Sequence, residues 1–249
     1  MSSEASSEIC GMVYLVGAGP GRVDHLTVQA SQLLQTCDVV IYDALINEDI
    51  LALVSDQCVQ VSVGKRGGQP SVSQSDINHL LVQYCYSHHR IVRLKSGDPF
   101  IFGRGMSEIQ ALREANCPYE IVPGISSALA APLFAGIPLT DPVLSHGFSV
   151  VSAHQPDELN WDALVQMDTV VILMGTRQLE TLVMTFLERG RSPQTPIAII
   201  QWAGHPQQHI WQGTLETILT QTSRQSLSPA VIVIGEVVGL RSYVAPNTL

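Results

Sequence analysis

The chain has 249 residues, of which 45% are hydrophobic and 14% are charged, and its formal net charge is −9. This length allows one large domain or two of ordinary size, with a sizeable apolar core. The acidic balance argues against a protein that binds nucleic acid, and no apolar run approaches the ~18–20 residues that a membrane span requires.

The N-terminal segment and the cysteines indicate the compartment. The first ten residues contain Ser and Glu without an apolar segment or a basic start, so we expect no signal peptide. The cysteines are odd in number and far apart, with no CxxC pair, which predicts reduced, mostly buried thiols of a cytoplasmic protein. The histidines also lack metal-ligand spacing, so we expect no metal. The five cysteines are Cys10, Cys37, Cys58, Cys85 and Cys117.

The first half of the chain alternates short apolar runs with segments of helical spacing. Strands are predicted over residues 12–16, 38–42, 59–63, 91–94 and 119–122, and helices over residues 27–34, 48–54, 76–86 and 106–114. Ser73 is predicted to cap the third of these helices. Strands that alternate with helices at this interval predict a mostly parallel, three-layer α/β sheet.

A second α/β series follows an interruption at Pro123-Gly124. A small apolar helix is predicted over residues 125–135, further helices near 161–166, 177–188 and 214–220, and strands near 148–152, 169–173, 197–200, 210–212 and 230–234. We therefore predict two α/β domains, residues 10–122 and 126–249, each a mostly parallel sheet flanked by helices. Ligands prefer the cleft between such domains, where we expect the active site.

A glycine-rich turn, Gly17–Gly21, follows the first predicted strand. Its spacing is GxGxG, whereas the dinucleotide-binding fingerprint is GxGxxG. Pro20 also removes one backbone N–H that a phosphate would use. A nicotinamide-dependent dehydrogenase is therefore disfavoured, while close approach of this backbone to another flat ligand stays open.

The segment Arg93–Gly105 has the composition of a binding loop. A buried strand runs into Ser-Gly-Asp-Pro, where Gly97 can adopt positive φ and Pro99 keeps Asp98 out of the helical region. Residues 60–105 contain six Lys or Arg against two acids, in a chain that is acidic as a whole. This local positive charge predicts a site for a small anionic ligand.

The predicted strand ends gather several of these features. The carboxyl ends of parallel strands meet at one edge of a sheet, and ligands bind there. The strands of the first half end at the glycine turn, at Asp43, at the basic loop Gly64–Gly68 and at the turn Ser96–Asp98. One edge is therefore expected to present a carboxylate, an ammonium and several guanidiniums.

With these pieces in order, the chain resembles the tetrapyrrole methylase family. The resemblance extends over nearly the full length, and its motifs are specific when taken together. They are VYLVGAGPG (13–21), VVIYD (39–43), VGKR (63–66), RLKSGDPFIFGRG (93–105), VPGISSALAAP (122–132), AGIPLT (135–140), LMG (173–175) and SPAVIVIGEVV (228–238).

The resemblance implies a two-domain α/β enzyme, usually a homodimer, that binds S-adenosylmethionine and releases S-adenosylhomocysteine without a metal. The nearest members methylate uroporphyrinogen III at C2 and C7, giving precorrin-2 through precorrin-1 for sirohaem and corrinoid synthesis. The resemblance also places the general base at Asp43 and a proton donor at Lys65. It places cofactor contacts at Pro20, Ser96, Gly97, Asp98, Ile101, Ser126, Ser127, Met174 and Ala203.

The substrate that the family methylates carries eight carboxylates, which agrees with the basic segment. Arginines bind carboxylates through paired, charge-assisted hydrogen bonds. The candidate anchors are Arg22, Arg66 and Arg104.

Simpler roles stay open for several of these residues. Asp43 could begin or cap the next helix, Lys65 could be a solvated loop charge, and Met174 could pack in the core. Ser126 and Ser127 could do no more than cap a helix.

The chain departs from the family pattern at a few positions. Ser96 stands where Gly is common, Ala44 where an Arg is common, and Asp141-Pro142 where His-Arg is common. These changes affect the substrate side more than the methyl donor. Two alternatives therefore stay open, a methylase acting on a later corrin precursor or another acceptor, and a non-catalytic protein that binds S-adenosylmethionine or a tetrapyrrole.

Overall fold

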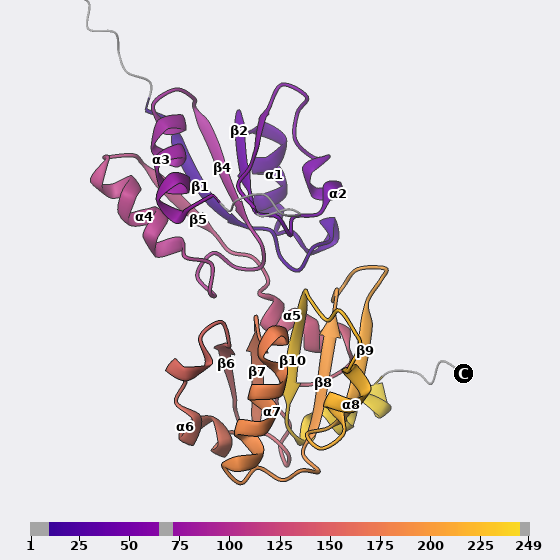
Figure 1. Ribbon diagram of the computed structural model, residues 1–249. Helices are drawn as coiled ribbons and strands as arrows, with labels where there is room; N and C mark the ends of the chain where they lie inside the picture. The colour runs from indigo at the N-terminus through magenta and orange to yellow at the C-terminus, as the bar shows by residue number, and fades with distance from the viewer. Residues whose placement is uncertain (1–9, 65–71, 245–249) are drawn as a thin grey trace, which may run out of the picture. The chain divides into compact units, whose positions relative to one another are not determined.

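The structure is a computed structural model that describes residues 10–64 and 72–244 (Figure 1). The chain divides into two compact units, Met1–Ser126 and Ser127–Leu249, which are described one at a time. Lys65 and Arg66 lie outside the described residues. Within the described part of the chain, no helix combines the length and the apolar character that crossing a bilayer requires.

The first unit contains a five-stranded sheet in the order β3-β2-β4-β1-β5. All four strand pairs are parallel, so the predicted parallel α/β sheet is confirmed for this unit. Its elements are β1 (Met12–Gly17), α1 (Val28–Thr36), β2 (Val39–Tyr42), α2 (Glu48–Leu51), β3 (Val59–Ser62), α3 (Gln74–Cys85), β4 (Arg90–Lys95), α4 (Gly105–Glu114) and β5 (Tyr119–Val122).

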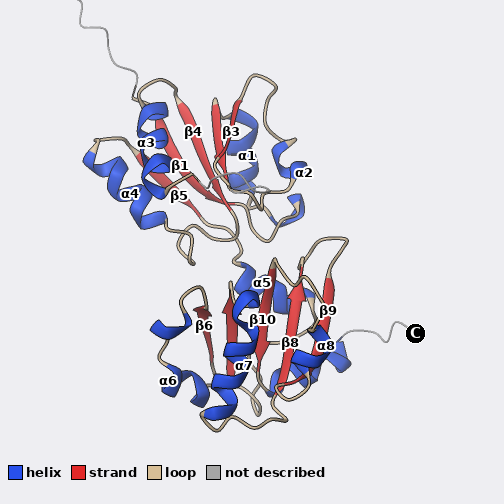
Figure 2. Cartoon of the chain, viewed as in Figure 1, coloured by secondary structure: helices blue, strands red, loops and turns tan. Residues whose placement is uncertain are grey.

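Helices cover both faces of this sheet (Figure 2), which explains why its central strands read as nearly continuous apolar runs. Successive side chains of a strand point to opposite faces. In β4, Val92 and Leu94 therefore pack on the side of α1 and α2, whereas Ile91 packs on the side of α3 and α4. Arg93 and Lys95 follow Ile91 at intervals of two and reach Glu108 of α4.

Local sequence signals account for the start of α3. The Ser73 side chain accepts a hydrogen bond from the Asp76 backbone N–H, and the Asp76 carboxylate accepts one from the Ser73 N–H. This reciprocal arrangement is a capping box, which satisfies two backbone donors at once. The prediction that Ser73 caps this helix is confirmed.

The second unit contains another five-stranded sheet, in the order β6-β7-β10-β8-β9. Only β6 and β7 pair in parallel, while the other three pairs are antiparallel. Its elements are α5 (Ser127–Phe134), β6 (Phe148–Ser152), α6 (Trp161–Gln166), β7 (Thr169–Leu173), α7 (Leu179–Glu188), β8 (Pro196–Gln201), β9 (His209–Thr214), α8 (Ile218–Thr222), β10 (Ala230–Ile234) and α9 (Arg241–Val244).

The second sheet thus differs from the mostly parallel sheet expected for this half. A parallel neighbour needs a long crossover, usually through a helix, whereas antiparallel neighbours can be joined directly. Residues 202–208 join β8 to β9 without a helix, and the two strands form a hairpin. The strand positions were predicted by the apolar runs, but their directions were not.

Three glycines bring the ends of β1, β4 and β5 into close contact. A Cβ atom added at Gly124 would lie 2.2 Å from the Gly97 carbonyl oxygen, and one added at Gly17 would lie 2.5 Å from the Gly124 nitrogen. Gly97 also exchanges two backbone hydrogen bonds with Gly19, with N···O distances of 2.9 and 3.1 Å. The backbone at this sheet edge is therefore packed too tightly for any side chain at Gly17 or Gly124.

We expect Gly124→Ala to lower the free energy of unfolding by about 1–3 kcal/mol, because the added methyl group must displace backbone atoms. Urea denaturation monitored by circular dichroism measures this change. Gly147→Ala is the matched control, since a Cβ there meets nothing within 4 Å. Equal stability of the two variants would show that the glycine contact is not tight in solution.

Candidate active site

The site begins with the bend that follows β4. Gly97 has φ 70°, in the left-handed region that favours glycine, and Ser96 before it is half-buried. The Asp98 carboxylate accepts hydrogen bonds from the backbone N–H groups of Phe100 at 2.8 Å and Gly124 at 3.4 Å. Asp98 thus ties the bend both to its own loop and to the segment after β5. Pro20 lies half-buried beside Gly19, which pairs with the bend.

Apolar side chains are exposed directly after the bend. Phe100, Ile101 and Phe102 are each about half exposed, although their character favours burial. Phe102 and Arg104 also have positive φ values, 53° and 57°. Such a conformation costs a non-glycine residue free energy, and strained residues of this kind concentrate at binding sites. The bend therefore combines exposed apolar side chains with a strained backbone, as ligand-binding loops do.

Asp43 lies at the end of β2, on the same sheet edge. Its backbone N–H donates to Leu94 of the neighbouring strand, and its Oδ1 accepts a hydrogen bond of 2.6 Å from Arg93 Nη2. The Asp43 side chain keeps 33% of its surface exposed. Helix α2 begins at Glu48 and is capped by Asn47, so the alternative that Asp43 caps this helix is wrong. Asp43 is instead a fixed and accessible carboxylate.

Three buried ions, Arg93, Lys95 and Glu108, lie behind the partly exposed Asp43, and we name the four residues together the charge cluster. Arg93 Nε donates to Glu108 Oε1 at 2.9 Å, and Lys95 Nζ contacts both Glu108 oxygens at 2.8 and 2.9 Å. The side chains of Arg93 and Lys95 are 2% exposed and that of Glu108 is fully buried. Two cations and two carboxylates make the charge cluster neutral.

The charge cluster corrects one interpretation of the sequence. Arg93 and Lys95 contribute two of the six positive charges from which an anionic-ligand site was predicted, but both are buried and paired within the protein. Glu108, which pairs with both cations, lies three residues after the segment 60–105 that contains the six positive charges. The spacing of Arg93 and Lys95, on the same strand face as buried Ile91, was the available signal for their burial.

Burial and pairing have opposite effects on the two cations. Burial alone would lower the pKa of Arg93, but Asp43 and Glu108 more than offset this, and the pKa lies above its ordinary value. The pKa of Lys95 is lowered, chiefly by burial and then by the nearby Arg93 charge, while Glu108 opposes the change. Pairing thus outweighs burial at Arg93, whereas burial outweighs pairing at Lys95.

The candidate substrate arginines have different surroundings. Arg22 is exposed and forms an ion pair of 2.5 Å with Asp24, also exposed. Arg104 is exposed and precedes α4 directly, at the end of the bend. Arg66, like Lys65, is outside the described residues, so both remain predictions.

The predicted residues of the second unit gather at one edge of its own sheet. Met174 follows β7 with φ 56°, and Trp202, the neighbour of Ala203, follows β8 with φ 49°. The register places Leu173 opposite Val231 and Gln201 opposite Ala230, so both strand ends flank the start of β10. Met174 is 51% exposed, which excludes core packing as the explanation for this residue.

Two further predicted residues lie where α5 begins. Ser127 is its first residue, and Ser126 immediately before it is buried. The strained turns at Met174 and Trp202 could not be recognised from the sequence, because neither position carries a glycine or an asparagine.

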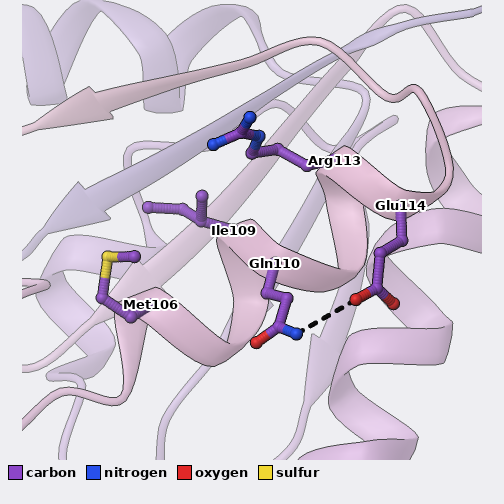
Figure 3. A pocket seen from close by; sticks show the side chains of 5 residues that line it. All are labelled: Met106, Ile109, Gln110, Arg113 and Glu114. Atoms are coloured by element: carbon purple, nitrogen blue, oxygen red, sulfur yellow. Dashed lines mark hydrogen bonds between the residues drawn. The ribbon is translucent and has the colours of Figure 1, made fainter.

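A pocket of about 450 Å³ lies along α4 (Figure 3). Its five lining side chains all come from this one helix, and two of them, Gln110 and Glu114, are hydrogen-bonded to each other. None is a predicted site residue, so the chemistry of the sheet edge gives the better candidate. The lining residues are Met106, Ile109, Gln110, Arg113 and Glu114.

The cysteines are all free thiols, as the sequence predicted. Cys37 and Cys58 lie with their sulfurs 3.5 Å apart in the core, and burial raises the pKa of both. Across the described residues, no group of three or more His, Cys, Asp or Glu side chains has the arrangement of a metal site.

Known proteins resemble this chain in sequence and in fold. A family profile described as "Tetrapyrrole (Corrin/Porphyrin) Methylases" matches residues 12–219. The "Uroporphyrinogen-III C-methyltransferase" of Synechococcus elongatus is 56% identical over 233 residues, which cover 94% of this chain and 96% of that protein. The "Siroheme synthase" of Actinobacillus pleuropneumoniae is 43% identical, and the match covers 96% of this chain but 50% of that longer protein.

A solved structure is similar over nearly the whole chain. Uroporphyrin-III C-methyl transferase from Thermus thermophilus, complexed with S-adenyl homocysteine, has a TM-score of 0.81 and 36% identity, with 92% of this chain and all of that chain covered. The Gly97 bend and the Asp43 carboxylate, both at the strand ends of a parallel sheet, are features typical of ligand-binding α/β proteins. The family profile and the identity to these relatives show which family this is. The chain belongs to the tetrapyrrole methylases.

We expect Glu108→Gln to lower the free energy of unfolding by about 3–5 kcal/mol, because it leaves two buried cations without their shared carboxylate. Adding Lys95→Met should recover most of this loss, since one cation is removed as well. Glu114→Gln, near the end of the same helix, should change stability by less than about 0.5 kcal/mol. Chemical denaturation of the four proteins measures the series, and an unaffected Glu108→Gln would contradict the pairing.

Proposed function

We propose that the protein transfers methyl groups from S-adenosylmethionine to C2 and C7 of uroporphyrinogen III, giving precorrin-2 through precorrin-1. One observation carries this proposal, the partly exposed Asp43 carboxylate held by Arg93 at the sheet edge that also carries the Gly97 bend. The relatives named uroporphyrinogen-III C-methyltransferase support the same substrate.

The residues at the bend fit the methyl donor. A nucleoside with a ribose and a cationic sulfur needs polar acceptors next to apolar surface. Ser96 and Asp98 offer a hydroxyl and a carboxylate, and exposed Ile101 offers apolar contact. We propose that these residues contact S-adenosylmethionine together with Pro20, Gly97, Ser126, Ser127, Met174 and Ala203.

The chemistry requires orientation and one proton acceptor. S-adenosylmethionine, when bound, supplies a methyl group on a positively charged sulfur. The π electrons of a pyrrole double bond attack the methyl carbon and form the new C–C bond, while the C–S bond breaks and leaves its electron pair on the sulfur of S-adenosylhomocysteine. The ring then carries one positive charge. Asp43 accepts a proton from the ring, whose C–H electron pair restores conjugation. Orientation and general base catalysis of this kind accelerate reactions by large factors, the latter by roughly 10²–10⁴.

The remaining roles follow the family. We propose Lys65 as a proton donor, and Arg22, Arg66 and Arg104 as anchors for the substrate carboxylates. Since Arg93 and Lys95 are neutralised inside the charge cluster, the arginines on the loops must supply the attraction for the anionic ring. We also propose a homodimer in the cytoplasm, whose product enters sirohaem or corrinoid synthesis.

A second candidate is a methylase that acts on a later corrin precursor, favoured by the altered positions Ala44 and Asp141-Pro142. Incubation with labelled S-adenosylmethionine and enzymatically made uroporphyrinogen III separates the two. Two methyl groups per ring support the proposed substrate. Transfer only to a ring that is already methylated selects the second candidate, and tight cofactor binding without transfer to any ring identifies a binding protein.

We expect Asp43→Asn to slow turnover by roughly 10²–10⁴-fold while the affinity for S-adenosylhomocysteine changes little, because the amide cannot accept the proton. Steady-state methylation and calorimetric titration measure the two quantities. The matched control is Asp56→Asn, an exposed carboxylate in a turn of the same unit. Unchanged turnover in Asp43→Asn would remove Asp43 from the base role.

We expect Arg104→Gln to raise KM for uroporphyrinogen III by roughly 10–100-fold, as loss of one hydrogen bond between charged groups costs about 1.5–3 kcal/mol. The affinity for S-adenosylhomocysteine should stay near that of the wild type. Arg113→Gln, an exposed residue at the other end of α4, serves as the control. If both variants keep the wild-type KM, Arg104 does not anchor the substrate.

A further inference from the structure

The charge cluster extends the proposed site into the protein interior. Arg93 lies between two carboxylates, with Nη2 on Asp43 at 2.6 Å and Nε on Glu108 at 2.9 Å. Its Nη1 donates to the backbone carbonyls of Ile41 and Leu94, at 3.3 and 3.1 Å. The guanidinium is thus fixed by the strands β2 and β4 and by α4, and it leaves Asp43 little freedom to turn.

Glu108 lowers the positive electrostatic potential that Arg93 creates at Asp43. The negative charge of Glu108 repels the Asp43 carboxylate and so opposes the attraction that Arg93 exerts on it. Lys95 in turn holds Glu108 through both oxygens, so the signs alternate from the sheet edge inward, as Asp43, Arg93, Glu108 and Lys95. Among the described residues, Asp43 interacts with Arg93 and Lys95 of β4 and, through Arg93, with Glu108 of α4.

We propose that Lys95 and Glu108 are positioning residues which, acting through Arg93, set the orientation and the basicity of Asp43. This inference rests on the proposed function in one respect, that Asp43 is the base. Neither residue touches the substrate, because both are buried behind Asp43. If Arg93 were the only charged residue behind Asp43, the net charge beside this carboxylate would still be +1. Arg93 would then lack its hydrogen bond to Glu108 of α4, which helps to hold it in position.

The net charge behind Asp43 can be changed and then restored by substitution, which distinguishes an electrostatic role of these residues from a purely structural one. Arg93, Glu108 and Lys95 together present a charge of +1 to Asp43. Lys95→Met removes a cation and leaves zero, so the variant should protonate Asp43 at higher pH than the wild type does. Adding Glu108→Gln removes an anion and returns the charge to +1, so the titration moves back toward that of the wild type.

Two measurements follow the titration. The first is the pH dependence of kcat/KM for methylation, in which the acidic limb should move up in Lys95→Met and return in the double variant. The second is the ¹³C chemical shift of the Asp43 carboxyl group, assigned by its loss in Asp43→Asn, which needs no turnover. Circular dichroism and calorimetric binding of S-adenosylhomocysteine check that each variant is folded, and Glu114→Gln is the control that should move neither titration.

The outcomes separate this inference from the proposed function. If the carboxyl titration moves and returns as expected while no methyl group is transferred, the charge cluster is as inferred and the proposed function fails. If methylation proceeds but the carboxyl titration is the same in all folded variants, the inference is overturned. It is also overturned if the double variant lies further from the wild type than Lys95→Met does, because accumulated structural damage would then explain the change.

Discussion

Pairing of the two cations buried at the end of β4 is the constraint on which the site depends. A charge without water needs an opposite charge in contact with it, and one carboxylate from α4 serves both cations. This requirement fixes α4 against the sheet. Since α4 begins directly after the bend, the same ion pairs also fix the far end of the loop that starts at Gly97. Electrostatics in the interior thereby determines the shape of a surface loop.

The two units form comparable sheet edges with different strand directions. In the first, parallel pairing brings all the strand carboxyl ends together, and glycines allow their backbones to touch. In the second, most strands are antiparallel, and the edge is formed by β7 and β8 on either side of β10. There the turns are made by Met174 and Trp202 in left-handed conformation. Strand direction therefore matters less to these edges than the turn that ends each strand.

Much of this arrangement could be predicted from the sequence because it depends on local patterns. Apolar runs and helical spacing predicted the elements and the first sheet, while the resemblance of eight motifs predicted the family. The pairing of Arg93 and Lys95 could not be predicted from local patterns, because their partners lie on α4 and just after β2, far away in the sequence. The antiparallel direction of β9 could not be predicted either, because an apolar run has the same period in both directions. The roles of Lys65 and Arg66 remain predictions, as they lie outside the described residues.

The left-handed residues have a consequence for protein engineering. Phe102, Arg104, Met174 and Trp202 hold φ values between 49° and 57°, where glycine or asparagine would be less strained. A stabilisation screen that rewards heat resistance alone would therefore favour replacing these four side chains early. Such variants would gain melting temperature by discarding groups proposed to contact ligands or lying next to them. Selection for thermostability and selection for turnover should thus diverge first at these turns.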